Sequence, residues 1–123
     1  MQTFPSIIKT AGSVLALAGS LALLPAPVTV AEASVVDEGK AVAYDRKKGN
    51  CLACHQMADG DLPGNIGPPL IAMKARYPDK AKLRAQIWDA TKANPNSIMP
   101  PFGRQQILSE GDIDKIVEYV YTL

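Results

Sequence analysis

The chain contains only one histidine and two cysteines among its 123 residues, and this shortage limits the metal and redox sites that it can form. A structural zinc site needs four ligands, usually from two ligand pairs, and the sequence has no second Cys or His pair to complete one. A thioredoxin-like dithiol would lie between a strand and a helix, but no convincing run of β-branched residues precedes the first cysteine. Zinc and dithiol redox chemistry are therefore both disfavoured.

The sequence also lacks an excess of charge of either sign. It has 13 Lys and Arg against 12 Asp and Glu, which gives a net charge of +1, and removing residues 1–33 leaves that value unchanged. Such a balance does not suggest binding to nucleic acid or to an anionic membrane. Any docking surface must be local, and Arg46-Lys47-Lys48 is either such a guide for an acidic partner or simply a solvated positive patch.

No apolar run reaches the roughly 20 residues that a membrane-spanning helix needs. The most apolar segment, residues 11–24, follows Lys9 and precedes Ala31-Glu32-Ala33, which has the small-x-small form of a cleavage site. We therefore predict a secretory signal over residues 1–33 and one domain over residues 34–123, exported to the periplasm with no membrane span in its mature form. Because no charge occurs between Lys9 and Glu32, an uncleaved anchor is the alternative.

The chain does contain Cys51-Leu52-Ala53-Cys54-His55, in which two cysteines three apart are followed at once by histidine. This is the attachment pattern of a c-type haem. Two thioether bonds reach the vinyl groups on one edge of the porphyrin, and the adjacent imidazole becomes the proximal iron ligand. We predict one covalent haem c on Cys51 and Cys54, ligated by His55. Copper is the better rival, since Met99 lies downstream, but it leaves one cysteine unexplained.

The hydrophobic pattern predicts helices and no sheet. A short helix is expected over residues 36–46, a loop rich in Pro and Gly over residues 57–70, and a helix over residues 79–91. A last amphipathic helix of about three turns follows Ser109, its expected cap. Its apolar positions are Ile113, Ile116, Val117, Val120 and Tyr121. We predict an all-α domain of three or four helices with Pro- and Gly-rich loops around one haem.

The sixth iron position decides between electron transfer and binding of a small molecule. Met57 is only two residues past His55, and Met73 lies in a stretch expected to become helical. Met99 lies 44 residues beyond His55, far enough to reach the opposite face, and prolines restrict the backbone behind it. We favour Met99 as the second axial ligand; the alternative is that it only fills the core.

Two further features bear on the haem pocket. The carbonyl of Pro68 is placed to accept a hydrogen bond from the other imidazole nitrogen of His55, which would fix the ring, unless these prolines merely stiffen a loop. Tyr77 and Trp88 are candidates to hydrogen-bond a haem propionate, although aromatic side chains near a short helix more often belong to the core.

Several blocks of the sequence together resemble SoxX, the family of monohaem c-type subunits of the SoxAX sulfur-oxidation cytochrome. The match runs over nearly all of residues 34–123. The more specific blocks are Gly-Asn-Cys-Leu-Ala-Cys-His and Met-Pro-Pro-Phe-Gly. The blocks span residues 49–55, 67–70, 76–78, 94–95 and 99–103.

The resemblance implies a class I cytochrome c fold, axial ligation by His55 and Met99, and a periplasmic heterodimer with SoxA. That complex couples thiosulfate oxidatively to a cysteine of the SoxYZ carrier, an L-cysteine S-thiosulfotransferase reaction. The chemistry is expected in SoxA, so this chain would only accept electrons and pass them to a small soluble cytochrome. A freestanding electron-shuttle cytochrome and a copper-binding or ligand-sensing module with an open metal position remain as alternatives.

Overall fold

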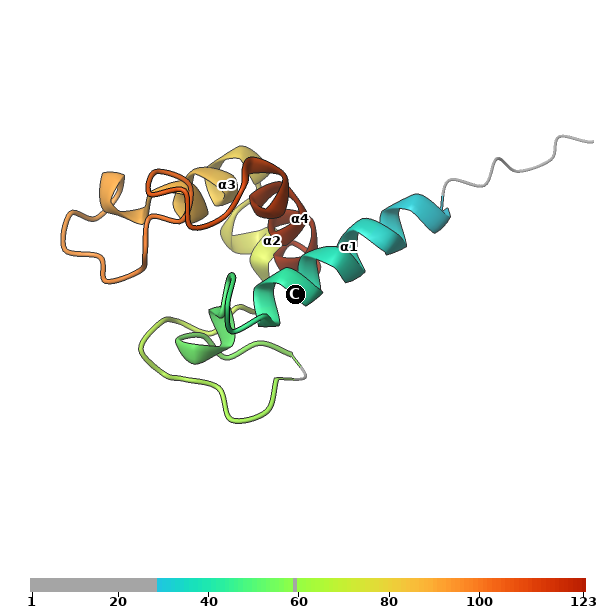
Figure 1. The fold of residues 1–123 in the computed structure, drawn as a ribbon, viewed down its shortest axis with the longest axis horizontal. Coiled ribbons are helices and arrows are strands. Elements are labelled where there is room, and N and C mark those ends of the chain that lie inside the picture. The colour runs from blue at the N-terminus through green and yellow to red at the C-terminus, as the bar shows by residue number, and fades with distance from the viewer. Residues whose placement is uncertain (1–28, 59) are drawn as a thin grey trace, which may run out of the picture.

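The computed structural model describes residues 29–58 and 60–123, with side chains from residue 34 onward. Within these residues the structure is helical and has no strand, apart from an isolated bridge between Met57 and Leu70. The elements in chain order are α1 (Thr29–Tyr44), η1 (Cys51–Ala53), α2 (Met73–Arg76), α3 (Lys80–Trp88), η2 (Ala90–Lys92) and α4 (Glu110–Val120) (Figure 1). The prediction of an all-α domain is confirmed.

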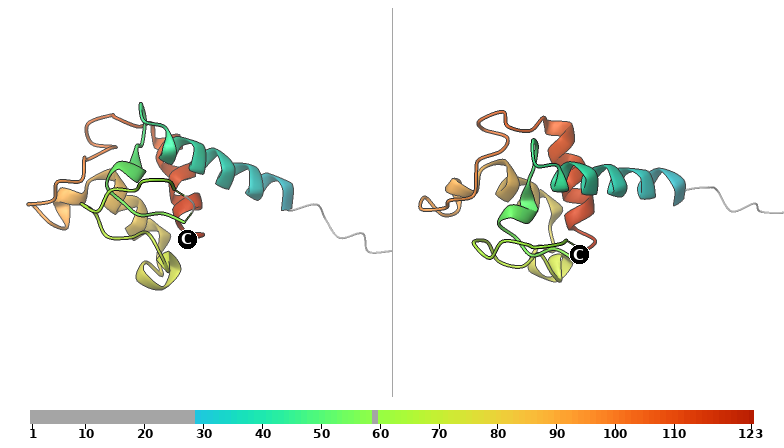
Figure 2. Two further views of the ribbon diagram at one scale, coloured as in Figure 1. Left: turned by 90° about the horizontal axis from the view of Figure 1, so that it is seen from below. Right: turned by 60° about the horizontal axis from the view of Figure 1, so that its bottom comes forward.

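Helices α1 and α4 cross in direct contact and make the most extensive helix packing of the described domain (Figure 2). Gly39 lies at the crossing, where an added Cβ would be 1.9 Å from the carbonyl oxygen of Lys115. A larger residue would force the two backbones apart, so this glycine sets the depth of the crossing. The rings of Tyr44 and Tyr119 pack edge to face beside it, with centroids 6.2 Å apart.

Helix α4 forms where the periodicity predicts it. The hydroxyl of Ser109 accepts a hydrogen bond from the Asp112 backbone N–H at 3.1 Å and caps the helix, and Glu110 and Asp112 place negative charge in the first turn. The predicted apolar stripe faces the core, with Tyr121 half-buried just past the helix end. Its fully buried members are Ile113, Ile116, Val117 and Val120.

The helix predicted over residues 79–91 is interrupted. Asp79 caps α3 by accepting from the Ala81 N–H at 2.8 Å, but α3 ends at Trp88. The Asp89 carboxylate accepts from the Thr91 N–H at 3.1 Å and starts the separate turn η2. An aspartate that bonds to nearby backbone competes with helix continuation, and this explains the break.

Helix α1 starts at Thr29, earlier than the predicted residue 36, and ends at Tyr44. The predicted cleavage position after residue 33 therefore lies within α1. The predicted apolar segment of the secretory signal, residues 11–24, lies outside the described residues, so the signal stays a prediction. Of the helices described, none combines the length and apolar character required to cross a bilayer.

The core joins α4 to α3 and to the loops that precede each of them. Leu83 and Ile87 of α3 are buried, as are Phe102 and Leu108 in the segment that leads into α4. Met73 holds α2 in the same core, and its N–H donates to the carbonyl of Leu123 at 2.9 Å. These core residues also line a large cavity.

Candidate haem site

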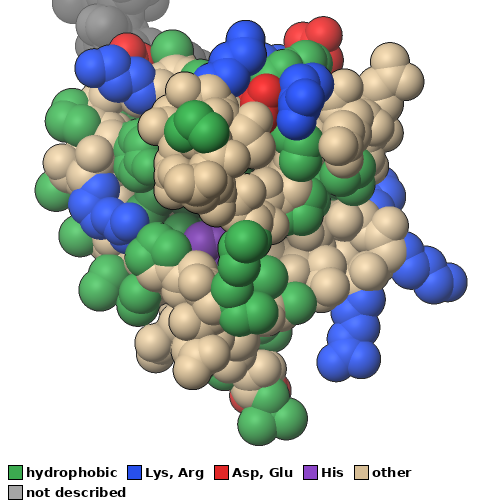
Figure 3. Space-filling model, turned by 90° about the vertical axis from the view of Figure 1, so that its left-hand side faces the viewer, with side chains coloured by type: hydrophobic (Ala, Val, Ile, Leu, Met, Phe, Trp, Pro, Cys, Tyr) green, Lys and Arg blue, Asp and Glu red, His purple; other side chains and the backbone are tan. Residues whose placement is uncertain are grey.

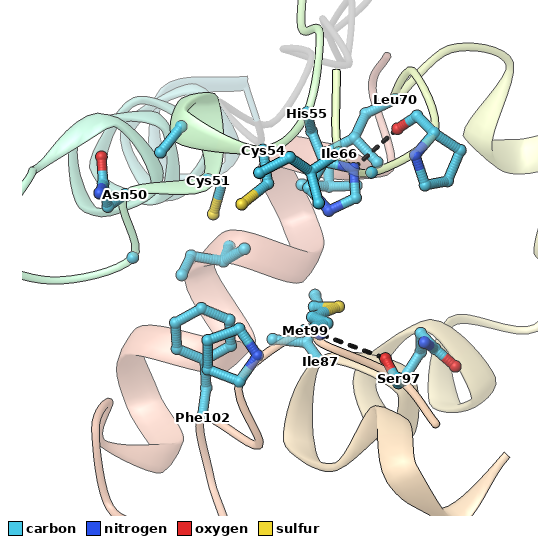
Figure 4. Close-up of a pocket in the computed structure, with 18 of the residues that line it drawn as sticks. Asn50, Cys51, Cys54, His55, Ile66, Leu70, Ile87, Ser97, Met99 and Phe102 are labelled. Atoms are coloured by element: carbon cyan, nitrogen blue, oxygen red, sulfur yellow. Dashed lines mark hydrogen bonds between the residues drawn. The ribbon is translucent and has the colours of Figure 1, made fainter. Parts of the chain in front are cut away.

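A cavity of about 720 Å³ opens between the loop that follows α1 and the loop that precedes α4. Cys51, Cys54, His55 and Met99, the residues singled out in the sequence, all line it (Figure 4). The volume lies within the roughly 300–1,000 Å³ typical of ligand and cofactor pockets. In the space-filling view the histidine is visible in a hollow edged by hydrophobic side chains (Figure 3). Apolar lining residues include Ile66, Leu70, Ile87, Phe102, Leu108 and Ile116.

The Cys-x-x-Cys-His segment is shaped by one tight turn, η1. Asn50 enters it with a left-handed φ of 46°. The backbone N–H groups of Cys54 and His55 both donate to the carbonyl of Cys51, at 3.1 and 2.9 Å. This turn places both sulfur atoms and the imidazole at the same cavity (Figure 4). One short segment can therefore supply two covalent attachments and one ligand.

The two thiols do not resemble those of a redox dithiol. Both cysteines are free and half-buried. Burial raises the pKa of the Cys51 thiol to about 11, and the nearby Cys54 adds to the increase. A dithiol catalyst needs a lowered thiol pKa, so the raised value disfavours the thioredoxin-like alternative. In the described part of the chain, no three Cys, His, Asp or Glu side chains are grouped to hold a metal ion, as zinc would require.

The imidazole of His55 is fixed by a backbone carbonyl. Its Nδ1 lies 2.7 Å from the oxygen of Pro68, as predicted from the sequence. A carbonyl oxygen can only accept, so Nδ1 carries the proton and donates. In the neutral ring the other nitrogen, Nε2, then keeps its lone pair, and Figure 4 shows it turned into the cavity. This is the tautomer that a metal-ligating histidine needs.

Gly67 permits this arrangement. A Cβ at this position would lie 2.4 Å from Cε1 and 2.8 Å from Nε2 of His55. The N–H of Gly67 also donates to the carbonyl of Cys54 at 2.8 Å, which holds the loop against the imidazole. The sequence alone does not reveal this role of Gly67, because the need for glycine depends on where the ring lies.

Met99 lies on the opposite wall of the cavity from His55 (Figure 4). It is half-buried, and its N–H donates to the Ser97 hydroxyl at 3.3 Å. Met57 is buried in the core away from the cavity lining. Met73 does line the cavity, but its sulfur accepts a hydrogen bond from Arg76 at 3.5 Å. Met99 is thus the methionine placed across from His55.

Of the two aromatic residues considered as partners for a haem propionate, only one lies at the cavity. Tyr77 lines the cavity. Trp88 does not: Gly103 approaches its ring so closely that an added Cβ would be 2.1 Å away, and the guanidinium of Arg84 lies 5.3 Å from the ring centroid. Trp88 is therefore a packing residue. Arg76 also lines the cavity, and the sequence alone did not indicate it as a residue of the site.

The helical fold, the apolar cavity and the paired Cys, His and Met donors together define a class I cytochrome c domain. The chain belongs to the cytochrome c family whose model is described as cytochrome C oxidase, cbb3-type, subunit III, which matches residues 35–120. This membership implies a covalently bound haem c, and the residues fit it: two thiols on one edge, an imidazole nitrogen with a free lone pair and a thioether across the cavity.

Among solved structures, one is similar to this chain in both fold and sequence. The crystal structure of SoxXA from P. pantotrophus superposes with a TM-score of 0.63 at 28% sequence identity, covering 70% of this chain and 79% of that chain. Family membership and this similarity together support an electron-transfer cytochrome that resembles SoxXA. A search of curated proteins gave no match.

Proposed function

We propose that this chain is the monohaem electron-transfer subunit of a periplasmic SoxXA-type complex. In this proposal residues 1–33 direct export, and residues 34–123 form the cytochrome domain. The partner would be a SoxA-like cytochrome that couples thiosulfate to a cysteine of a SoxYZ-like carrier. This chain would accept the electrons and pass them to a small soluble cytochrome.

The observation that carries the electron-transfer role is the opposition of His55 and Met99 across one cavity. When bound, haem c supplies reversible one-electron transfer at its iron. Cys51 and Cys54 would hold the macrocycle covalently, and His55 and Met99 would hold its iron. An iron held by both residues would offer no position to thiosulfate, so bond formation would take place in the partner. A methionine ligand also raises the reduction potential, which suits an electron acceptor.

The lining of the cavity supports the same role. Burial among apolar side chains excludes water and disfavours the more highly charged oxidised state. Arg46, Lys47 and Lys48 are exposed and lie at the cavity, on the chain just before Cys51. Their positive charge is suited to guiding an acidic region of a redox partner towards this opening.

The first test is an absorption spectrum of the oxidised periplasmic protein, repeated for Met99→Ala. We expect the weak near-infrared band of methionine sulfur bound to haem iron in the wild type and its loss in the variant. A haem spectrum without that band in the wild type would contradict ligation by Met99 and favour a ligand-sensing module. A protein that contains copper and no haem would overturn the proposal.

The second test concerns the partner. The tagged chain is purified from the periplasm of its own cells, and thiosulfate oxidation is measured with and without it. Copurification of a larger cytochrome, together with loss of thiosulfate oxidation on deletion, is the expected result. A stable monomer whose removal leaves thiosulfate oxidation intact would instead identify a freestanding electron shuttle.

A further inference from the structure

Two successive proline carbonyls beside the haem cavity are bound by two different side chains. The oxygen of Pro68 accepts from Nδ1 of His55 at 2.7 Å. The oxygen of Pro69 accepts from Nη1 of Arg76 at 2.6 Å. A guanidinium donor makes the second of these a charge-assisted hydrogen bond, which is roughly twice as strong as a neutral one. The carbonyls of two neighbouring residues thus accept hydrogen bonds from an imidazole and a guanidinium.

This segment has few other means of holding its shape. The N–H of Gly67 donates to Cys54 and the N–H of Leu70 donates to Gln56, both at 2.8 Å. Between these two bonds lie Pro68 and Pro69, which have no N–H to donate. The backbone of these two prolines can therefore be held only through their carbonyls. Both prolines are exposed, so without Arg76 the Pro69 carbonyl would accept a hydrogen bond from water instead.

Arg76 is itself presented from an anchored helix. Its N–H donates to Ala72 at 3.1 Å, and α2 is tied to the end of the chain by the bond from the Met73 N–H to Leu123. Met73, which is 1% exposed, fixes α2 in the core, and its sulfur accepts a second contact from Nη1 of Arg76. No carboxylate of the described residues forms an ion pair with Arg76. Its charge is therefore directed to the Pro69 carbonyl.

We propose that Arg76 is a positioning residue for the proximal ligand: by holding the Pro69 carbonyl, it keeps the Pro68 carbonyl within reach of Nδ1 and so fixes the orientation of the His55 imidazole. The inference rests on the proposed function, because His55 acts there as the iron ligand. Arg76 itself touches neither the imidazole nor the iron. Arg76 is held by α2, which is anchored in the core. It acts on His55 through the peptide group that joins Pro68 to Pro69.

The test is hydrogen exchange of the His55 Nδ1–H, followed by proton NMR in the holoprotein. Arg76→Met removes the donors and keeps an unbranched side chain near Met73. We expect the Nδ1–H to exchange at least about tenfold faster, the factor that a lost charge-assisted bond is worth. Lys74→Met, on the same short helix, removes a charge that binds no backbone carbonyl and serves as the matched control. Amide exchange in α4 measures any general loss of stability.

The outcomes separate the two proposals. Faster Nδ1–H exchange in Arg76→Met, with α4 amides and the Lys74→Met protein unchanged, supports the positioning role. Unchanged Nδ1–H exchange, or an equal acceleration of Nδ1–H and α4 amides, overturns it even when haem is bound. If Arg76→Met does not fold, Arg76→Gln takes its place: it lacks the charge, so the Nδ1–H should still exchange faster than in the wild type, and unchanged exchange would overturn the inference. A wild-type protein without covalent haem would overturn the proposed function first.

Discussion

The walls of the cavity that carry His55 and Met99 are held by different kinds of hydrogen bond. On the His55 wall, backbone bonds join Gly64 to Leu52, Gly67 to Cys54 and Leu70 to Gln56, across 12 to 14 residues of sequence. The imidazole adds the bond to Pro68. These contacts tie the loop after the haem-attachment motif back onto the motif itself.

The Met99 wall is held mainly by local bonds. The N–H of Ser97 donates to Asn94 at 2.9 Å, the N–H of Met99 donates to the Ser97 hydroxyl, and the N–H of Phe102 donates to Pro100 at 2.9 Å. Each spans only two or three residues.

The Met99 segment is fastened to the rest of the protein just beyond this point. The Gly103 N–H donates to the Trp88 carbonyl at 3.1 Å, and Arg104 forms an ion pair with Asp89 at 2.9 Å.

Local bonds shape a segment without fixing it to its surroundings, whereas bonds distant in sequence fix one segment against another. We therefore infer that the imidazole is preset by the fold, while the methionine sits on a softer segment held at its ends. Opening of such a segment needs less free energy than opening the core, so Met99 should be the ligand that leaves first. Four sets of variants test this difference.

The largest effect is expected from Gly67→Ala on the His55 wall. The new Cβ would fall 2.4 Å from the imidazole and displace either the ring or the loop. We expect a loss of about 1–3 kcal/mol in the free energy of unfolding, the usual cost of overpacking, measured by urea denaturation of the holoprotein. The control is Gly111→Ala, where an added Cβ meets nothing within 4 Å and should be neutral or stabilising. Equal effects at the two glycines would contradict a preset imidazole.

The next contrast is between two methionines. Met99→Ala should lower the reduction potential by a sizeable part of the roughly 0.8 V that axial ligands span, with little change in stability because Met99 is half-buried. Met73→Ala should do the opposite: the buried side chain is 1% exposed, so its loss should cost about 2–5 kcal/mol while the near-infrared band remains. Potentiometry measures the reduction potential of both variants, and urea denaturation measures their free energy of unfolding. A Met99→Ala protein that keeps its potential would refute the assignment.

A smaller, pH-dependent effect is expected at Asp89, which anchors the Met99 segment. The Thr91 hydroxyl and N–H, with help from Arg104, outweigh desolvation and hold the pKa of this carboxyl below its usual value of 3.8. Little of its surface is exposed, but it lies close to solvent, so desolvation opposes the shift only in part.

Because the folded-state pKa is depressed, the carboxylate stabilises the protein above pH 3.8, and this contribution is lost as the pH falls through the folded-state value. Asp89→Asn should thus lower the Tm by about a few degrees at pH 7, with the gap to wild type closing at low pH. Thermal unfolding at both pH values measures it. A gap that does not depend on pH would mean that packing, and not charge, anchors the segment.

The residues of the site could be read from the sequence where covalent spacing or one chemical property decides them. The interval between the cysteines and His55 is fixed by the porphyrin edge, and a proline carbonyl near a histidine is a natural acceptor. The stripe on α4 likewise required only the helical period and a cap at Ser109. Met99 was favoured because the other methionines lie too near in sequence or in a helical stretch.

Other features depend on contacts that no spacing reveals. The break at Asp89 arises because its side chain bonds to Thr91, a choice decided by the turn that follows. The contact between Arg76 and Pro69 exists because Leu123 and the core place α2 beside the loop that contains Pro69. The steric requirement at Gly67 appears only when the ring is in place. Tertiary packing, and not local sequence, therefore determines how the ligands are held.

The smallest expected effect is at Ser97, whose hydroxyl accepts from the Met99 N–H at 3.3 Å. Ser97→Ala removes this one neutral bond, and the freed N–H can turn to water, so the cost should not exceed about 1 kcal/mol. The sensitive measurement is displacement of Met99 by added imidazole, which should become up to about fivefold tighter. Ser97→Thr, which keeps the hydroxyl, should restore the wild-type affinity. Arg76→Met should leave this affinity nearly unchanged, because it acts on the other wall; a larger effect from Arg76→Met than from Ser97→Ala would mean that the two walls are coupled and the comparison fails.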